Sequence, residues 1–256
     1  MTFSFYHEFI LLVGGVSILG YEIVLELFRG KVFFNLVAEQ IYQLGVRSIP
    51  LVFLTALTIG MVMSLQFGLG LEKFGGKLYV PKLIAATVIR EIGPMFTSLM
   101  LAARVGAGIA SEIGSMMVTQ QIDAIRALGT SPIQKVVIPR VLALLISLPI
   151  LVVFANIIGM TGGMIIGATE LGLDPNFYFI KTINTIAFAD YISGFGKTFF
   201  FALFISVPAC YYGLNVKDGT HGVGSATTKS VVTSSILILV GDFFLSKLFW
   251  LIQKWN

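Results

Sequence analysis

The chain has 256 residues, of which 56% are apolar and only 12% are charged, about half the charged share of an average soluble domain. Its mean hydropathy is +0.92, so too little polar surface remains to cover a soluble globule of this size. This composition excludes a disordered protein, a nucleic-acid tail and a disulfide scaffold, and it predicts a polytopic membrane protein.

The basic residues exceed the acidic ones, 17 to 13, but they are scattered singly between apolar runs. We therefore expect them to lie among lipid headgroups and expect no nucleic-acid partner. Cys210 is the only cysteine, and His7 and His221 are far apart in the sequence. No cluster of these residues with carboxylates has the spacing of a metal site, so none is predicted.

The N-terminal region, residues 1–47, is predicted to carry a helix that lies at the membrane interface. Its longest uncharged stretch, Phe9 to Tyr21, has 13 residues, fewer than the ~20 that cross a bilayer. Arg29 and Lys31 follow at the end of this stretch, as is typical of an interfacial helix.

Five longer apolar runs predict membrane-spanning helices in residues 48–256, and therefore an all-α integral membrane protein. With the N-terminal region they form a single predicted domain, 1–256. The predicted spans are residues 48–71, 83–110, 141–169, 191–216 and 227–251. Trp250 and Trp255 end the last one as an aromatic belt. Lys and Arg divide almost evenly between the two sides, so charge does not decide the orientation.

Small residues recur at every fourth position in three of these spans. The three sets are Gly60, Ser64 and Gly68; Gly106, Ala110 and Gly114; and Gly159, Gly163 and Gly167. Such stripes let helix backbones approach closely in lipid. They are explained by packing inside one bundle or by a seam around a pore or between two copies.

Arg90 and Glu91 are the most informative pair of the second span. They lie about 10 Å along the helix from Leu83, within one leaflet, where a charge costs about 3 kcal/mol. Adjacent residues point about 100° apart, so the two cannot pair well with each other. Pro94 frees the backbone carbonyl of residue 90 and predicts a kink. The pattern indicates either a polar cavity or a structural ion pair, such as Glu91 with Lys197.

Two further charges in the spans are predicted to be structural. Asp242 lies in the fifth span, where Arg90, Arg104 and Lys247 are the candidate partners, although Lys247 is far along the same helix. Arg104 lies near the end of the second span and can extend its side chain to the interface.

Residues 111–129 form the most polar stretch and predict a short amphipathic helix between two spans. Val118, Ile122, Ile125 and Leu128 would share one face, and Gly129 followed by Pro132 ends the helix. Such a helix either lies on the membrane or docks against a soluble partner.

No enzyme motif is present in the sequence. Gly196, Lys197 and Thr198 look like the end of a phosphate-binding loop, but position 191 is Tyr instead of the required Gly. If ATP drives this protein, another chain must hydrolyse it.

The sequence resembles the MlaE (YrbE-like) permease family of ABC lipid transporters. The resemblance covers most of the chain from about residue 35 and is strongest at 88–140 and 219–242. It rests on several motifs in the same order: Arg90-Glu91-Ile92-Gly93-Pro94, Ala103-Arg104-Val105-Gly106, Glu112-Ile113-Gly114, Pro139-Arg140 and Gly222-Val223-Gly224 with Ala226-Thr227-Thr228.

The resemblance implies a permease subunit, not an enzyme, in the cell inner membrane with its N-terminus in the cytoplasm. It implies a homodimer, a soluble ATPase subunit that holds ATP and Mg, and a periplasmic MCE-domain protein; the chain itself needs no cofactor. The substrate would be phospholipid or a related hydrophobic lipid, moved between the inner and outer membranes. The rival functions are an ion-coupled secondary transporter, for which inverted repeats are not visible, and a structural scaffold.

The resemblance also assigns roles to residues. Residues 111–129 would be the cytoplasmic coupling helix that docks on the ATPase, with contacts at Glu112, Met117, Gln120, Gln121, Asp123 and Arg126. Gln120 departs from the family, which often has Glu there. Arg90 and Glu91 would hold the lipid headgroup, and the acyl chains would contact Leu57, Met61 and Leu65 of the first span. We expect ATP-driven motion of the coupling helix to narrow the lipid cavity.

Overall fold

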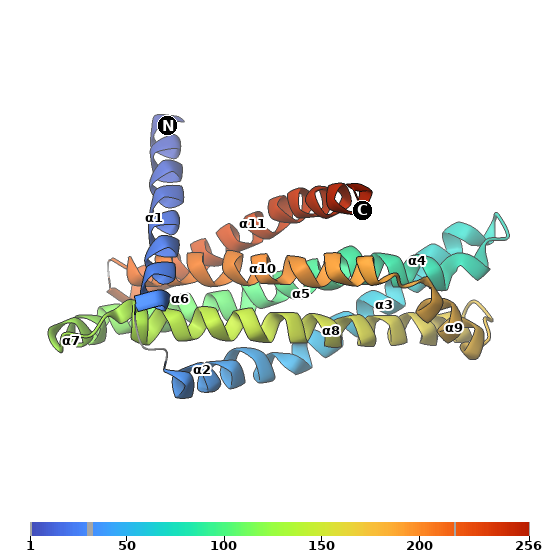
Figure 1. Ribbon diagram of the computed structural model, residues 1–256, viewed down its shortest axis with the longest axis horizontal. Helices are drawn as coiled ribbons and strands as arrows, with labels where there is room; N and C mark the ends of the chain where they lie inside the picture. Colours follow the sequence, from blue (N-terminus) through green and yellow to red (C-terminus); the bar gives the residue numbers. More distant parts are fainter. Residues whose placement is uncertain (1, 30–32, 218, 256) are drawn as a thin grey trace. The chain divides into compact units, whose positions relative to one another are not determined.

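The computed structural model describes residues 2–29, 33–217 and 219–255, and these residues form helices joined by short connections (Figure 1). Within these residues, five helical segments are long and apolar enough to cross a membrane, which confirms the predicted number of spans. They are Phe34–Glu72, Lys77–Val118, Ile133–Thr169, Phe188–Leu214 and Gly219–Ile252.

The N-terminal region differs from the single interfacial helix that the sequence predicted for residues 1–47. Helix α1 (Thr2–Arg29) is followed by α2 (Phe34–Gln40), which continues through the π-helical segment η1 (Ile41–Gly45) and the 3₁₀ turn η2 (Val46–Ser48) into the first span. The charges of this stretch concealed its helicity, because the prediction relied on uncharged runs. The interfacial placement of α1 stays a prediction.

The remaining spans are assembled from several consecutive helical segments. The first is completed by α3 (Ile49–Glu72), and the second contains α4 (Val80–Thr87), η4 (Val88–Ile92), α5 (Gly93–Leu101), η5 (Ala102–Gly106) and α6 (Ala107–Val118). The third is η6 (Ile133–Val137) with α8 (Ile138–Thr169), and the last two are α10 (Phe188–Leu214) and α11 (Gly219–Trp255). The short helices α7 (Gln121–Ala127) and α9 (Pro175–Thr185) lie in connections.

The chain divides into two compact units. The first contains Met1–Val46, Leu101–Ile146 and Ala202–Leu237, and the second contains Arg47–Met100, Ser147–Phe201 and Ile238–Asn256. In the first unit, α1 packs against η6, and Leu19 and Ile23 are its buried apolar side chains among those described.

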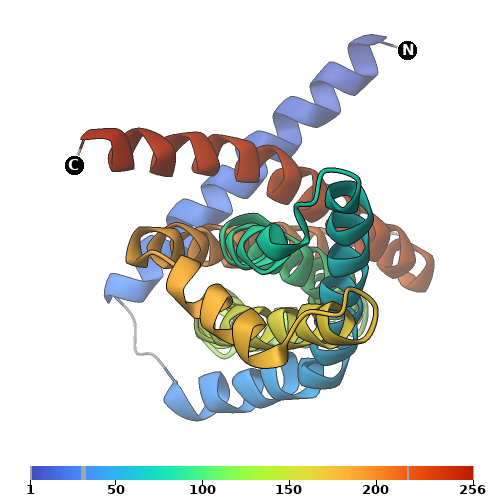
Figure 2. The ribbon, with the colours of Figure 1, turned by 90° about the vertical axis from the view of Figure 1, so that its right-hand side faces the viewer.

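In the second unit, α4 packs against both α3 and α9, and α9 lies beside α4 in Figures 1 and 2. Asp174 begins α9 by accepting a hydrogen bond from the Phe177 amide at 2.9 Å, and Pro175 occupies the first turn. An oxygen at this position satisfies an amide that the helix leaves without a partner. The cap therefore fixes where the chain turns back to cover α4.

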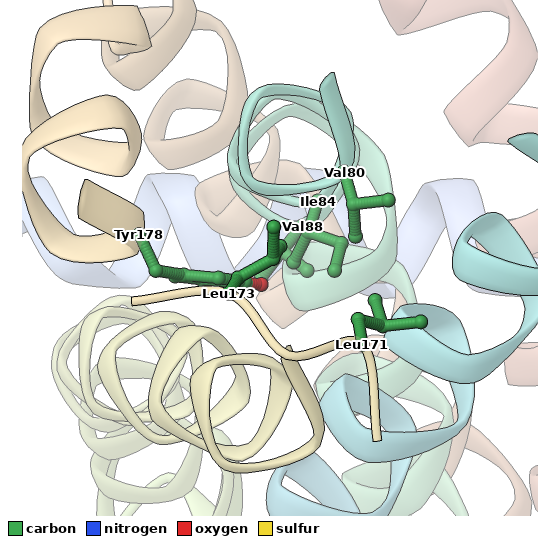
Figure 3. Close-up of a cluster of buried hydrophobic side chains, with 6 residues drawn as sticks. All are labelled: Val80, Ile84, Val88, Leu171, Leu173 and Tyr178. Atoms are coloured by element: carbon green, nitrogen blue, oxygen red, sulfur yellow. The ribbon is translucent and has the colours of Figure 1, made fainter. Parts of the chain in front are cut away.

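A cluster of buried side chains joins these elements: Val80 and Ile84 of α4, Val88 of η4, Leu171 and Leu173 of the loop, and Tyr178 of α9 (Figure 3). The Tyr178 ring lies so close to α8 that a methyl group on Gly163 or Gly167 would collide with it. Burial raises the pKa of Tyr178 to about 12, so the phenol stays neutral and acts as a packing group.

The small-residue stripes serve packing within the chain. Ala56, Gly60, Ser64 and Gly68 form the buried face of α3, and a methyl group on Gly60 would overlap the carbonyl oxygen of Gly159 in α8. The stripe of the second span faces other helices of the first unit, since Gly106 lies beside Ile205 and Ser230. Of the two readings, the structure therefore supports packing inside one bundle.

Candidate functional site

A buried lysine joins three membrane spans of the second unit. Lys197 of α10 has no exposed surface, and its Nζ lies 2.6 Å from Glu91 Oε2 of η4 and 3.0 Å from Asp242 Oδ1 of α11. Lys197 Nζ also donates to the Ser246 hydroxyl at 2.7 Å. An ammonium group without water can persist only when carboxylates and hydrogen bonds replace its hydration.

The backbone of the second span contributes to the same cluster. Pro94 has no amide hydrogen, so the Arg90 carbonyl lacks its usual partner within the helix. Lys197 Nζ donates to this carbonyl at 3.1 Å. The chain forms a π-helical turn over Val88–Ile92, directly before Gly93 and Pro94, and this is the local distortion at the position where the sequence predicted a kink.

Asp242 pairs with a residue that was not among its predicted partners. The sequence suggested Arg90, Arg104 or Lys247, but the structure places it against Lys197. The alternative pairing of Glu91 with Lys197 is present. Ser246 lies one helical turn after Asp242 and donates to Glu91 at 3.1 Å. Helix α11 therefore supplies one acidic group of the cluster, Asp242, and a hydrogen bond to the other, Glu91.

Arg90 has a carboxylate partner of its own. Its guanidinium lies 2.6 Å from Asp190 Oδ1, in the first turn of α10. The Asp190 side chain is buried, whereas 51% of the Arg90 side chain is exposed. Asp190 precedes Lys197 by seven residues, about 10 Å along the helix. Arg90 is therefore anchored near the end of a span, and half of its side chain remains open to a ligand.

A small crevice lies beside the π-helical turn, with a volume of about 20 Å³, room for about one water molecule. From α3 it is lined by Thr55, Ala56, Ile59 and Gly60, instead of the predicted acyl-chain residues Leu57, Met61 and Leu65. Leu57 and Met61 are half-buried and Leu65 is exposed. The crevice is too small for an acyl chain, and neither Arg90 nor Glu91 is among its lining residues.

The predicted coupling helix consists of two helices and a turn. Residues 111–118 are the last turns of α6, Gln120 adopts a left-handed conformation with φ of 59°, and α7 begins at Gln121. The single helix predicted over 111–129 is therefore wrong, because the left-handed residue breaks it. Val118 consequently does not belong to the α7 face: Ile122 is buried there, and Leu128 is 78% exposed.

The predicted ATPase-coupling residues separate into two groups. Asp123 and Arg126 form an ion pair of 3.1 Å on the outer face of α7, with more than half of each side chain exposed, and Gln120 and Gln121 are exposed beside them. Met117 is half-buried in the last turn of α6. Glu112 instead pairs at 3.0 Å with Arg140, which is buried at the start of α8.

The Glu112–Arg140 pair closes the base of the segment that carries α7. Arg140 also donates to the Val136 carbonyl at 2.8 Å, so one guanidinium ties the middle of α6 to the start of the third span. Arg104 is exposed in η5. The structure therefore offers Asp123, Arg126 and Leu128 as the outward surface of α7, with Glu112 beneath it.

Sequence reasoning missed Asp190 and Ser246 as members of the charged site. The sequence could have indicated Ser246, since it lies one helical turn after Asp242 on the same face of the helix. The indication for Asp190 is weaker: it is an acidic residue in the first turn of a span, where a negative charge is favourable. Among the described residues, no group of three or more His, Cys, Asp or Glu side chains could hold a metal ion.

Comparisons with known proteins agree with this architecture. The sequence model of the family described as "Permease MlaE" matches residues 37–248. A "Probable ABC transporter permease protein" of Rickettsia felis is 37% identical over 238 residues, covering 93% of this chain and 92% of the relative.

Two further relatives carry more specific names. The "Intermembrane phospholipid transport system permease protein MlaE" of Haemophilus influenzae is 33% identical over 83% of this chain and 82% of its own length. The chloroplastic "Protein TRIGALACTOSYLDIACYLGLYCEROL 1" of Arabidopsis thaliana is 31% identical over 92% of this chain and 67% of its own length. By this match and its five spans, the chain belongs to the MlaE family of ABC transporter permeases, multi-pass membrane subunits that are not enzymes.

Proposed function

We propose that this permease moves phospholipid or a related hydrophobic lipid between the inner and outer membranes, driven by a separate ATPase subunit. The observation that carries the proposal is Arg90, a half-exposed guanidinium anchored by Asp190 within an apolar span. A guanidinium matches the phosphate of a lipid headgroup in charge and geometry. The phospholipid transport named for the Haemophilus relative supports the same substrate class.

Glu91 has a different part in this proposal from Arg90. Its carboxylate already accepts from Lys197 and Ser246, so it fixes the wall of the lipid site and adds little to headgroup binding. The crevice inside the unit holds about one water molecule. We therefore place the lipid outside this crevice, between two copies of the chain, with Leu57, Met61 and Leu65 of α3 as candidate acyl-chain contacts.

The complete transporter in this proposal lies in the inner membrane with the N-terminus of each chain in the cytoplasm. Two permeases bind two ATPase subunits, which hold ATP and Mg, and an MCE-domain protein continues the lipid path on the periplasmic side. The position of α7 is the support for the ATPase contact. The helix lies in the connection between two spans, and its outer face carries the exposed Asp123–Arg126 pair. Force applied there would pass through the Glu112–Arg140 pair to both adjoining spans.

Replacing Arg90 with glutamine should lower lipid transfer between donor and acceptor vesicles about tenfold or more, because a charge-assisted phosphate contact contributes roughly 1.5–3 kcal/mol. Arg90→Lys keeps the charge and should retain an intermediate rate. The measurement is transport by the reconstituted permease with its ATPase, divided by ATP hydrolysis. Unchanged transport by a folded Arg90→Gln variant would contradict the headgroup role, and transport without the ATPase would favour an ion-coupled transporter.

Exchanging the charges of α7, as Asp123→Arg with Arg126→Asp, should abolish co-purification of the ATPase. The exchange keeps an ion pair within the helix while it reverses the outward charges. An exposed pair contributes less than about 1 kcal/mol, so thermal stability should hardly change. Lys181→Glu on α9, an exposed charge in another connection, is the control. Retained assembly of the exchanged variant would contradict docking through α7.

A further inference from the structure

The connection between α10 and α11 joins two consecutive membrane spans. Phe188–Leu214 and Gly219–Ile252 are consecutive spans, and only residues 215–218 separate them, with 218 outside the described residues. The shorter of the two spans, α10, has 27 residues and is about 40 Å long, close to the thickness of a bilayer with its headgroups, so we place the link near the level of the headgroups. Polar side chains gathered here therefore face phosphate groups before they face bulk water.

A pocket of about 360 Å³ opens beside this connection, within the first unit. It is lined by Asn215 and Lys217 on one side and by His221, Ser225 and Lys229 on the other. None of the described residues that line it is acidic, and no described carboxylate forms an ion pair with either lysine. The described residues of the lining thus offer two ammonium groups, an imidazole, an amide and a hydroxyl, and none of them is an anion; Asp218, which follows Lys217, lies outside the described residues.

The backbone holds the two sides of the pocket together. A methyl group on Gly222 would overlap the carbonyl oxygen of Lys217, so the Lys217 backbone lies directly against the first turn of α11. Below the pocket, the Tyr212 hydroxyl lies 3.0 Å from Thr233 Oγ1 and links the two helices. Lys217 therefore lines the same pocket as His221, Ser225 and Lys229 of α11.

The cationic face of α11 continues directly into an exposed apolar face. His221, Ser225 and Lys229 follow one another at four-residue steps, and Val232 and Ile236 continue the same side of the helix. Val232 is 51% exposed and Ile236 is 55% exposed. This arrangement matches a phospholipid, whose phosphate would lie in the cationic pocket and whose acyl chain would lie along the adjoining apolar face.

We propose that this pocket, defined by Lys217, His221, Ser225 and Lys229, is a binding site for the headgroup of an anionic phospholipid, with an acyl chain along Val232 and Ile236. The site is separate from Arg90 and does not depend on transport, so its test requires neither ATPase nor nucleotide. Each lysine near the membrane surface contributes roughly 1 kcal/mol toward an anionic lipid. The adjoining apolar face favours a lipid over a free phosphate ion.

The test uses the full chain in nanodiscs of phosphatidylcholine with a minor fraction of phosphatidylglycerol, followed by native mass spectrometry of the lipids retained. Lys217→Gln with Lys229→Gln should lower retained phosphatidylglycerol at least about tenfold. Lys135→Gln with Lys247→Gln, which removes two exposed lysines elsewhere, should leave it unchanged. Val232→Ser with Ile236→Ser should also lower retention, because the acyl-chain contact is lost.

Four results would overturn the site. The first is equal retention of phosphatidylcholine and phosphatidylglycerol by the unmodified chain. The second is a loss of phosphatidylglycerol in the Lys135→Gln, Lys247→Gln control that equals the loss in the Lys217→Gln, Lys229→Gln variant. Displacement of phosphatidylglycerol by millimolar inorganic phosphate alone would indicate a site for soluble phosphate. A fall in the dimer fraction of the Val232→Ser, Ile236→Ser variant with unchanged lipid would show that a second copy covers this face. Monodisperse elution of each variant establishes that it is folded.

Discussion

Replacing Lys197 with methionine should destabilise the second unit more than any other single charge removal in the chain. Methionine fills a similar volume, but it leaves Glu91, Asp242 and the Arg90 carbonyl without their common donor. Breaking a buried ion pair on one side costs about 3–5 kcal/mol, because the remaining charge stays buried. In a chain of this size that corresponds to a fall in Tm of about 10 °C or more.

The matched control is Lys247→Met, which removes an exposed lysine of α11 and should change Tm by at most a degree or two. Neutralising the carboxylates as well, with Glu91→Gln and Asp242→Asn, should recover much of the loss, because no uncompensated charge then remains. The measurement is thermal unfolding of the purified protein in detergent. Equal Tm values for Lys197→Met and Lys247→Met would show that the cluster does not hold the spans together.

The spans could be predicted because lipid imposes a simple rule on the sequence. A long, mainly apolar run can be satisfied only as a membrane helix, and five such runs gave five spans, although three of them also carry charges. The rule misses the parts of a helix that continue past the apolar run into polar sequence. Residues 34–47 include Glu39 and Arg47, and their helical extension of the first span was not predicted. Helix ends at 118 and 133 were also missed, because polar residues continue a membrane helix beyond the bilayer core.

The charged site was only partly predictable, because its pairings join distant parts of the chain. The depth of Arg90 and Glu91 follows from helix geometry, and their failure to pair with each other follows from the angle between adjacent residues. Which lysine meets which carboxylate depends on how helices rotate against one another, and for Asp242 the partner is 45 residues away. No periodicity within one helix carries that information.

The break between α6 and α7 has a local cause that the sequence hides. A left-handed conformation is uncommon for residues other than glycine, and glutamine has no particular preference for it. Gln120 adopts it directly after Thr119, whose hydroxyl donates to the Ser115 carbonyl at 2.9 Å at the end of α6. The helix that follows buries Ile122. Tertiary packing thus overrides the local preference at this turn.

Replacing Gly60 with alanine should destabilise the α3–α8 contact by about 3 kcal/mol, near the upper part of the range for overpacking. The added methyl group would overlap the carbonyl oxygen of Gly159. This neighbour belongs to the backbone, so no side-chain rotation relieves the overlap and the two helices must separate. Separation would also loosen the crevice lined by Ile59, Val88 and Ile92, and lipid transport should fall together with Tm.

Gly70→Ala in the same helix is the matched control, because a methyl group there meets nothing within 4 Å. Alanine is a better helix former than glycine by about 1 kcal/mol, so Gly70→Ala should keep or raise Tm while Gly60→Ala lowers it. Equal effects of the two variants would mean that the stripe responds only to helix propensity. Opposite effects would show that the close backbone approach at Gly60 is itself what joins α3 to α8, as the small-residue spacing predicts for helices that pack in lipid.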